Sequence, residues 1–381
     1  MEEVDPDAAG VVEVVGETPG NQTGYGAYFN VTAQLCMDFA LPLYGYMMPI
    51  LLVVTVISNT LIILVLSKRH MRTPTNIVLM TMALADLFTM IFPAPWLFYL
   101  YTLGNYVRPI SPTSACYAYA IMMEILPNLF HTASIWLTLA LALQRYIYVC
   151  HPTTARTWCT IPRVLWAIFS IFLLSVLHQG TNALSRNFVS APHREGCLVT
   201  EAYWVEFLTP EVYYSVYYWF RVAFVHTLPC LFLVILNVLL FSALKKAERK
   251  RKNLLKDNRK NESRKMRDSQ STTCMLIVVV SVFLVVEIPL AVLTFLHILQ
   301  SVYTSVLIVE YEVANCLILF SNFFIAVSYP INFAIYCGMS RQFRETFSDL
   351  FMRRDASEIV DTTTTMVNGT RTNLESNETV L

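Results

Sequence analysis

The chain has 381 residues, of which 55% are hydrophobic and 14% are charged, and its 27 basic and 27 acidic residues balance. Ordinary soluble domains carry charges on about a quarter of their residues, so this composition excludes a single soluble globular domain. It indicates a membrane protein, and we expect no nucleic-acid partner.

Residues 1–43 precede the first long apolar stretch, and we expect them to form an extracellular N-terminal segment. The first 35 residues are acidic and lack the basic start and apolar core of a cleavable signal peptide, so the first span must serve as the anchor. Asn21 and Asn30 open sequons for N-glycosylation on this segment. Sequons at Asn261, Asn368 and Asn377 fall on the opposite side of the predicted membrane, so topology has to choose among them.

Seven apolar stretches are long enough to cross a hydrocarbon core of about 30 Å as helices. Several contain Pro or Gly, which a spanning helix tolerates when its neighbours satisfy the freed backbone groups. We predict an all-α membrane protein with a seven-transmembrane helix bundle over residues 44–337. The predicted spans are Tyr44–Ser67, Asn76–Tyr101, Tyr117–Val149, Val164–Leu184, Tyr213–Leu244, Thr273–Leu299 and Val309–Cys337.

The basic residues indicate how the bundle is oriented. Of the 27 Lys and Arg residues, 23 lie in or beside the segments that follow predicted spans one, three, five and seven, and twelve of these lie between Lys245 and Arg267. Short cytoplasmic loops carry the excess of positive charge. We therefore predict a multi-pass plasma-membrane protein with its N-terminus outside and its C-terminus inside the cell.

Three of the nine cysteines, Cys36, Cys116 and Cys197, lie on or near the oxidising side of this topology. A bridge between Cys116, which opens span three, and Cys197, in the loop before span five, would hold that loop over the mouth of the bundle. The alternative is two free thiols. Cys36 has no obvious partner, although Cys316 near the outer part of span seven is a candidate.

A series of residues recurs through the spans in a characteristic order. They are Ser58-Asn59, Leu84-Ala85-Asp86-Leu87, Gln144-Arg145-Tyr146, Trp166, Pro229, Pro289 and Pro330. No single member is specific, but their order and spacing together resemble the rhodopsin-like (class A) G-protein-coupled receptors. The resemblance covers all seven spans and implies a receptor, not an enzyme, that binds an extracellular ligand and activates heterotrimeric G proteins without a cofactor.

Departures from that family pattern narrow the resemblance. Gln144 stands where the family usually has Asp or Glu, Glu287 stands at the usual tryptophan position, and Tyr329-Pro330 replaces Asn-Pro. Cys116 precedes Arg145 by about one helical turn more than usual. With the stretches His131–Thr138 and Ile331–Gly338, these variants resemble the insect peptide receptors for sex peptide, myoinhibitory peptides, myosuppressin and FMRFamide-like peptides.

Other classes fit less well. An opsin needs a lysine in span seven, and no lysine follows Lys265. An amine receptor needs an acidic residue at the position that Pro127 occupies. A seven-helix transporter or channel is the alternative from another class, but no inverted repeat or pair of broken helices supports it. No His-Glu-x-x-His motif or comparable catalytic constellation indicates an enzyme.

Asp86 and Glu287 are carboxylates near the predicted middle of the membrane, where a charge needs a cation, a proton or hydrogen bonds. The family resemblance implies that Asp86 and Ser134 hold a sodium ion and water in the inactive bundle. Glu287 either joins that network or forms the floor of the ligand pocket. The simpler alternative for both residues is a protonated carboxyl hydrogen-bonded to a neighbouring helix.

Polar residues in the outer halves of the spans are candidates for binding a peptide. Glu124 is preferred, because a carboxylate near the mouth could meet a cationic or amidated peptide end. Histidines here also serve ordinary contacts between helices, which is the simpler reading. In the outer loop, aromatic side chains suit a peptide rich in Trp or Phe, whereas those of residues 213–220 suit a membrane-interface belt. The full set of candidates is Glu124, His131, Arg221, His226, Glu287, His297, Tyr203, Trp204 and Phe207.

On the inner side, the resemblance implies that Arg145 holds the helix ends together at rest and contacts the G protein when span six moves outward about Pro289. Tyr146, Tyr329 and Pro330 belong to the same switch. Gln144 offers no negative charge to Arg145, so we expect a weaker resting latch and some basal activity. Most of the basic residues between spans five and six are expected to be solvated or near anionic lipid.

Beyond span seven, Phe343 and Phe347 recur at helical spacing among basic residues, which predicts an amphipathic membrane-surface helix over residues 338–354. Residues 355–381 are polar and predicted to be disordered. Phosphorylation of their Ser and Thr residues would supply charge for an arrestin to bind, with a simple linker as the alternative. The terminal Thr379, Val380 and Leu381 suit a PDZ domain, a match that short tails also make by chance.

Overall fold

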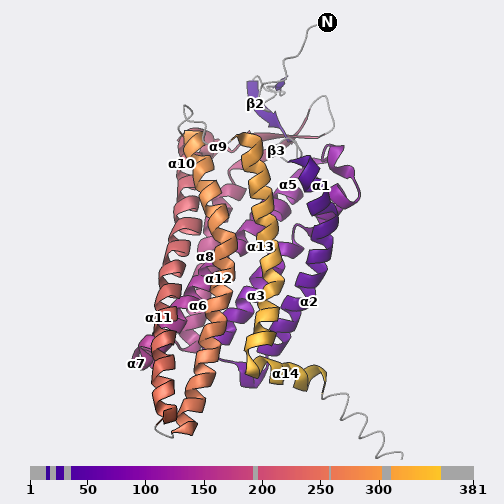
Figure 1. Cartoon of the computed structure of the whole chain (residues 1–381). Helices are drawn as coiled ribbons and strands as arrows, with labels where there is room; N and C mark the ends of the chain where they lie inside the picture. The colour runs from indigo at the N-terminus through magenta and orange to yellow at the C-terminus, as the bar shows by residue number, and fades with distance from the viewer. Residues whose placement is uncertain are drawn as a thin grey trace, which may run out of the picture.

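The structure is a computed structural model that describes residues 14–17, 23–29, 36–191, 196–256, 259–302 and 310–352. Long helices lie side by side along most of the molecule (Figure 1). A small sheet crosses one end of this bundle, and the short helix α14 (Arg341–Phe351) lies across the other. We refer to these as the sheet end and the α14 end.

Within the described residues, seven helices are long and apolar enough to cross a membrane. They are Met37–Leu66, Pro74–Thr102, Thr113–Cys150, Ile161–Ala183, Pro210–Leu254, Gln270–Gln300 and Glu312–Met339. The predicted seven-transmembrane bundle is therefore confirmed. Most boundaries lie within a few residues of the predicted ones, and the larger differences are an earlier start of span one and a longer span five.

Each span is built from the following elements. Span one contains α1 (Met37–Pro42), η1 (Leu43–Met47) and α2 (Met48–Leu66), and span two contains α3 (Pro74–Ile91), α4 (Ala94–Leu97) and η3 (Phe98–Thr102). Span three contains α5 (Thr113–Tyr119), η5 (Ala120–Ile125) and α6 (Leu126–Cys150), and span four is α8 (Ile161–Ala183). Span five contains α10 (Pro210–Phe220), η6 (Arg221–Thr227) and α11 (Leu228–Lys256), span six is part of α12 (Lys260–Val302), and span seven is α13 (Tyr311–Met339). Short connecting elements are η2 (Arg69–Met71), η4 (Asn105–Val107), α7 (Pro152–Trp158) and α9 (Tyr203–Leu208).

Four of the described spans contain a turn of π-helix close to a proline: η1 follows Pro42, η3 follows Pro95, η5 precedes Pro127 and η6 precedes Pro229. Proline lacks the backbone N–H and crowds the carbonyl four residues earlier, so the regular hydrogen-bond ladder is interrupted nearby. A wider turn then takes up an extra residue. In span three this turn lies between Cys116 and Arg145, where the sequence is about one helical turn longer than in the family it resembles.

The small sheet joins two segments that are far apart in the sequence. The strands β1 (Val14–Glu17), β2 (Thr23–Tyr28), β4 (Cys197–Glu201) and β3 (Arg186–Ser190) pair antiparallel in that order. The backbone N–H of Phe29 extends the pairing by donating to the Cys197 carbonyl at 2.9 Å. The N-terminal segment and the loop before span five therefore cross the end of the bundle together, an arrangement that the sequence analysis did not predict.

Two disulfides fix the sheet end. Cys116–Cys197 joins span three to β4, as predicted, with its Cα atoms 6.7 Å apart. Cys36 bonds to Cys316, with 5.5 Å between their Cα atoms, so the partner that the sequence left open lies in span seven. The start of span one and the loop before span five are thus both covalently tied to the bundle.

The α14 end is held by apolar packing. Phe343 is buried against Phe333 and Tyr336, with ring centroids 6.0 and 5.8 Å apart, and Leu137 and Leu276 belong to the same core. The predicted helix after span seven is present, but it begins at Arg341 and not at residue 338, because α13 continues to Met339. Residues 353 and 354 of the predicted helix lie outside the described residues.

The basic segment between spans five and six is largely helical in the described residues, since α11 continues to Lys256 and α12 begins at Lys260. The absence of apolar periodicity does not prevent this, because Lys, Arg and Glu are themselves good helix formers. Many of the described side chains in this segment are exposed, in agreement with their predicted solvation.

Candidate functional site

Polar side chains inside the bundle gather at four levels between the sheet end and the α14 end. We call them the mouth cluster (Glu124, Asn128, Arg186, Arg221), the central cluster (His131, His226, Glu287, Tyr329), the Asp86 cluster (Asp86, Ser134, Asn332) and the α14-end pocket, which contains Arg145.

The mouth cluster contains a partly buried ion pair. Arg186 on β3 places Nη2 2.5 Å from Glu124 Oε2 in η5. Arg221 in η6 donates to Asn128 Oδ1 at 3.0 Å, and Asn128 donates to the Glu124 carbonyl at 2.7 Å. The cluster therefore links the sheet to spans three and five. The predicted ligand candidate Glu124 is already paired by a loop arginine.

Electrostatics keep Arg186 charged at this position. Burial alone would lower the pKa of the guanidinium, but the Glu124 carboxylate outweighs burial, and the pKa is raised above its ordinary value. A peptide that binds here meets a preformed ion pair rather than a free carboxylate. It can gain a charged contact only by sharing or displacing one of the two partners.

The central cluster surrounds a carboxylate that is completely inaccessible to solvent. Glu287 on α12 has 0% exposure, and its Oε1 lies 2.8 Å from Nδ1 of His226 in η6. Its Oε2 lies 3.3 Å from Nε2 of His131 on α6, close enough for an ion pair but not aligned as a hydrogen bond. His131 Nδ1 lies 3.3 Å from the hydroxyl of Tyr329 on α13.

A proton must reside in this cluster, because a 2.8 Å contact between an imidazole nitrogen and a carboxylate oxygen needs a hydrogen between them. Spans three, five and six meet at Glu287, and span seven joins through Tyr329. Breaking one partner away from a buried charge is costly, on the order of 3–5 kcal/mol. The cluster therefore ties the relative positions of four spans to one another.

The Asp86 cluster lies next to the central cluster. Ser134 donates to Asp86 Oδ1 at 2.6 Å, and Asn332 Nδ2 lies 3.5 Å from Asp86 Oδ2. These residues and Tyr329 line a cavity of about 20 Å³, room for one water or a small ion. No group of three or more His, Cys, Asp or Glu in the described residues is arranged to hold a metal ion. One carboxylate with neighbouring hydroxyl oxygens suits a hydrated monovalent ion rather than a transition metal.

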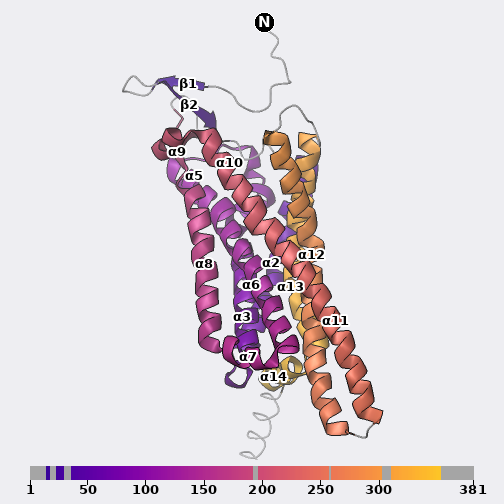
Figure 2. The ribbon, with the colours of Figure 1, turned by 90° about the vertical axis from the view of Figure 1, so that its left-hand side faces the viewer.

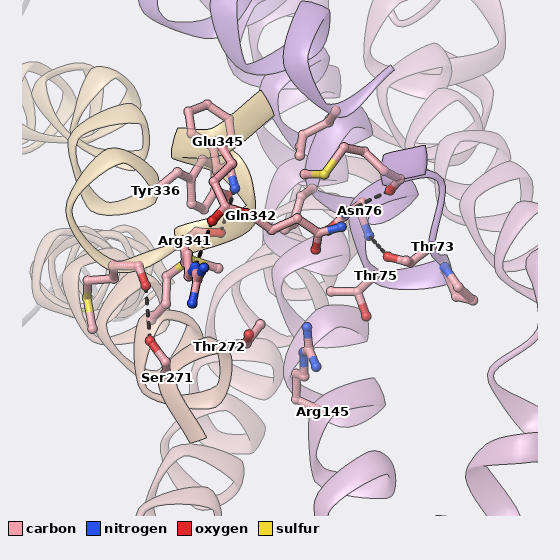
Figure 3. A pocket seen from close by; sticks show the side chains of 18 of the residues that line it. Thr73, Thr75, Asn76, Arg145, Ser271, Thr272, Tyr336, Arg341, Gln342 and Glu345 are labelled. Atoms are coloured by element: carbon pink, nitrogen blue, oxygen red, sulfur yellow. Dashed lines mark hydrogen bonds and ion pairs between the residues drawn. The ribbon is translucent and has the colours of Figure 1, made fainter. Parts of the chain in front are cut away.

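The α14-end pocket has a volume of about 680 Å³ and is lined by residues of α3, α6, α12, α13 and α14 (Figure 3). The side chain of Arg145 extends into it between Thr75 and Thr272. Ser271 donates to the Met339 carbonyl at 3.1 Å, and Arg341 pairs with Glu345 at 2.7 Å on the far wall. A cavity formed by so many helix ends changes shape whenever one of them moves.

Arg145 has no carboxylate partner among the described residues. Its guanidinium lies 5.9 Å from the centre of the Tyr148 ring, and its buried Nε atom has no hydrogen-bond partner. The neighbouring Gln144 is 4% exposed, and neither polar atom of its amide is satisfied. Gln144 predicts that Arg145 lacks an acidic neighbour in sequence. Among the described residues, no carboxylate from another part of the chain takes that place.

The remaining predicted residues lie apart from these clusters. Trp204 donates to the Leu184 carbonyl at 2.9 Å, whereas Phe207 and Tyr203 on α9 are 80% and 82% exposed. Pro289 and Pro330 lie within α12 and α13, and Tyr146 stacks edge-on against His151. The side chain of His297, the sequons at Asn21 and Asn30, and the tail with Thr379, Val380 and Leu381 lie outside the described residues.

Sequence reasoning missed Arg186 and the pairing of His226 with Glu287. A signal was present in the second case, because a buried glutamate requires a cationic or protonated partner, and His226 is the one histidine of the neighbouring fifth span. Arg186 offered no comparable signal, because its position depends on the pairing of β3 with β4, and neither segment has the strong alternation that would predict a strand.

Comparisons with known proteins agree with this architecture. Residues 46–354 match the family described as serpentine type 7TM GPCR chemoreceptor Srw. The chain is 52% identical over 363 residues to the sex peptide receptor of Drosophila melanogaster, covering 93% of this chain and 83% of that receptor. It is 33% identical to sex peptide receptor-related protein 2 of Caenorhabditis elegans, with 85% and 77% covered. The FMRFamide receptor of Drosophila melanogaster is 26% identical, with 82% of this chain and 54% of the receptor covered.

The family match spans most of the chain, and the two sex-peptide-receptor relatives exceed 30% identity over most of their length. The members of this family are receptors of the plasma membrane that act on G proteins and are not enzymes. The bundle, the Cys116–Cys197 bridge and Arg145 at its pocket occur in the order that the sequence pattern predicts. The chain therefore belongs to the family of seven-transmembrane G-protein-coupled receptors.

Proposed function

We propose that this receptor is activated by a peptide of the sex-peptide or myoinhibitory-peptide type and couples to an inhibitory G protein. The observation that carries the proposal is the 52% identity to the sex peptide receptor of Drosophila melanogaster over 93% of the chain. The exposed aromatic rings of Tyr203 and Phe207 at the sheet end support a peptide rich in Trp or Phe. The more distant FMRFamide receptor supports FMRFamide-like peptides or myosuppressin as the second candidate.

The proposed orientation places the sheet end outside the cell and the α14 end inside. Two disulfides at the sheet end support it, because disulfides form in oxidising compartments. The concentration of Lys and Arg in the loops at the α14 end supports it as well. The peptide then approaches the mouth cluster, and the G protein approaches the pocket that contains Arg145.

In the proposed mechanism, the bound peptide displaces the Glu124–Arg186 pair, and the movement of spans three and five changes the contacts of Glu287. Glu287 lies two residues before Pro289, so a change at the central cluster acts on α12 where its backbone ladder is already interrupted. An outward movement of the α14 end of α12 opens the pocket around Arg145 to the G protein. The ligand thus shifts a population between two bundle arrangements.

The ligand proposal is tested with cells that express the chain and report inhibitory and calcium-linked signalling together. Sex peptide, myoinhibitory peptides, myosuppressin and FMRFamide are applied over full concentration ranges. We expect half-maximal responses to sex peptide or myoinhibitory peptides at concentrations roughly tenfold or more below those of the other two. Cells without the receptor are the control, and the reverse order of potency would assign the second candidate.

The central cluster generates a second prediction. Glu287→Gln removes the carboxylate that two histidines contact and should therefore destabilise the resting state. A loss of about 1 kcal/mol from the resting state raises a minor active population roughly fivefold. Basal nucleotide exchange on the G protein should rise accordingly at matched surface expression. Glu206→Gln, at an exposed carboxylate on α9, is the control and should change nothing. Unchanged or reduced basal exchange in Glu287→Gln would show that the cluster does not hold the resting state.

The unpaired Arg145 generates a third prediction. Gln144→Asp places a carboxylate beside the guanidinium, and the new ion pair should lower basal exchange about two- to fivefold. Gln144→Leu adds no charge and should leave basal exchange unchanged or higher. Two results would contradict the expectation that Arg145 is weakly held at rest. One is basal exchange by the parent receptor no higher than that of empty cells, and the other is an equal effect of the two substitutions.

The Asp86 cluster is proposed to bind a sodium ion in the resting bundle. Its carboxylate and hydroxyl oxygens and its cavity of about 20 Å³ support a hydrated monovalent ion. When sodium replaces choline at constant ionic strength, agonist affinity should fall about two- to tenfold in the parent and remain constant in Asp86→Asn. Affinity that is independent of sodium in both receptors would remove the ion from the mechanism.

Two further partners are proposed for residues outside the described part of the chain. Phosphorylated Ser and Thr residues beyond position 355 suit an arrestin, and Thr379, Val380 and Leu381 suit a PDZ domain. Recovery on immobilised PDZ domains that is unaffected by removal of Leu381 would exclude that partner. Asn21 and Asn30 remain the proposed glycosylation sites because the orientation places them outside the cell.

A further inference from the structure

A second cavity of about 690 Å³ lies on the outside of the bundle between spans three, four and five. Its floor includes Trp136 on α6, one wall is α8, and the other wall is α10 and η6. Figure 2 shows α8 and the α10–α11 helix close together at the sheet end and diverging toward the α14 end. The volume falls in the range that buries a small-molecule ligand.

This groove opens toward the membrane. Leu174 on α8 and Val216 on α10 are each 66% exposed at its edges, and Phe220 and Phe224 are exposed beside them. All four residues belong to spans, so the medium that contacts them is lipid and not water. The groove shares no lining residue with the α14-end pocket and contains none of the four residues of the mouth cluster.

The lining is apolar and uncharged. Among the described residues that form the groove, none is Asp, Glu, Lys or Arg. The hydroxyls of Thr132, Ser175 and Thr181 donate to backbone carbonyls within their own helices. An ionic headgroup therefore finds no counter-charge in the lining, which argues against a phospholipid headgroup or a fatty-acid carboxylate within the groove.

Two polar atoms near the sheet end of the groove have no partner. His178 Nε2 and the Tyr213 hydroxyl are buried and make no hydrogen bond to any described residue. The His178 ring stacks on Tyr217 at 4.7 Å, which holds it at the seam between α8 and α10. Tyr213 also stacks on Tyr217, at 6.1 Å, so both residues contact the same ring. Buried polar atoms are usually hydrogen-bonded, so an unpaired imidazole nitrogen and an unpaired phenol in one lining indicate a missing hydroxyl partner.

The length of the groove fits one leaflet. Ile171 and Thr181 lie ten residues apart on α8, about 15 Å along the helix axis, which is half of a hydrocarbon core about 30 Å thick. Trp204 and Tyr213 lie at its polar end, and Trp and Tyr favour the membrane–water interface. A ligand that fills the groove thus has a polar group at the interface and an apolar body within one leaflet.

We propose that this groove between α6, α8 and α10 binds one sterol, with its hydroxyl at His178 and Tyr213 and its rigid ring system against the apolar walls. The side chains of His178 and Tyr213 rotate slightly to meet the hydroxyl. A sterol combines the features that the groove requires, namely one neutral hydroxyl, a rigid apolar body and the length of a single leaflet. The site is independent of the identity of the activating peptide.

The test uses the full chain in phosphatidylcholine nanodiscs that contain a photoactivatable cholesterol analogue. Labelled residues are located by mass spectrometry, and unlabelled cholesterol is the competitor. We expect labelling that saturates at about one analogue per chain and maps to residues 171–181 and 213–225. Val216→Trp and Leu174→Trp fill the groove from opposite walls and should each weaken labelling roughly tenfold or more, whereas Val212→Trp, at an exposed valine of α10 outside the lining, should not.

The hydroxyl contacts are tested separately. Tyr213→Phe and His178→Phe keep the aromatic rings and remove one polar partner each, so each should weaken labelling roughly two- to tenfold. Tyr218→Phe, at an exposed tyrosine outside the lining, is the matched control. Thermal unfolding in sterol-free nanodiscs verifies that each variant is folded. Because Val216→Trp and Leu174→Trp lie on different helices, the test still stands if one of these two variants fails to fold.

Several outcomes would overturn the proposal. Labelling that rises without saturation and is equal in Val216→Trp and Val212→Trp would identify ordinary surrounding lipid. Saturable labelling that maps to other segments would place the site elsewhere. Competition by oleate as effective as that by cholesterol would show that the groove takes acyl chains and that the hydroxyl assignment is wrong.

Discussion

The buried carboxylate of Glu287 places the strongest constraint on the arrangement of the spans. A charge without solvent access must keep its partners, and these partners come from spans three and five while Tyr329 of span seven contacts one of them. The helices therefore cannot slide or rotate independently without exposing a polar atom to an apolar interior. The same property makes the cluster suited to switching. A small displacement of one helix changes the free energy strongly where it separates Glu287 from a partner, and only weakly where one Leu packs against another.

The prolines determine which side chains reach these clusters. The extra residue in a π-turn rotates the helix on one side of the turn relative to the other side. The turns η5 and η6 lie directly on the sheet-end side of Leu126 and Leu228. Glu124 and Arg221 lie within the turns themselves. The polar mouth of the bundle is thus formed by backbone that has departed from the regular α-helical ladder, and the regular segments below it carry the apolar core.

The sequence predicted the spans and the Cys116–Cys197 bridge because both depend on strong, local signals: apolar length and the compartment of a thiol. It also placed Asp86 with Ser134, through family resemblance. It named Cys316 only as a candidate partner of Cys36, and it did not predict the pairing of Arg186 with Glu124 or the four-stranded sheet. Each of these depends on contacts between segments far apart in the chain, for which no local signal exists. The π-turns were missed because proline indicates where a helix is disturbed but not whether it kinks or widens.

The two ends of the bundle are held by different interactions, and this difference favours movement at one of them. At the sheet end, two covalent bridges and a sheet join the N-terminus and the loop before span five to spans three and seven. At the α14 end, the described contacts around Arg145 include no ion pair to it, and the pocket of 680 Å³ leaves space between the helix ends. Apolar contacts such as those of Phe343 are non-directional, so they tolerate rearrangement better than hydrogen bonds or disulfides do. In the proposed mechanism, a ligand that binds at the fixed sheet end therefore produces its largest displacement at the α14 end, and the central cluster connects the two levels.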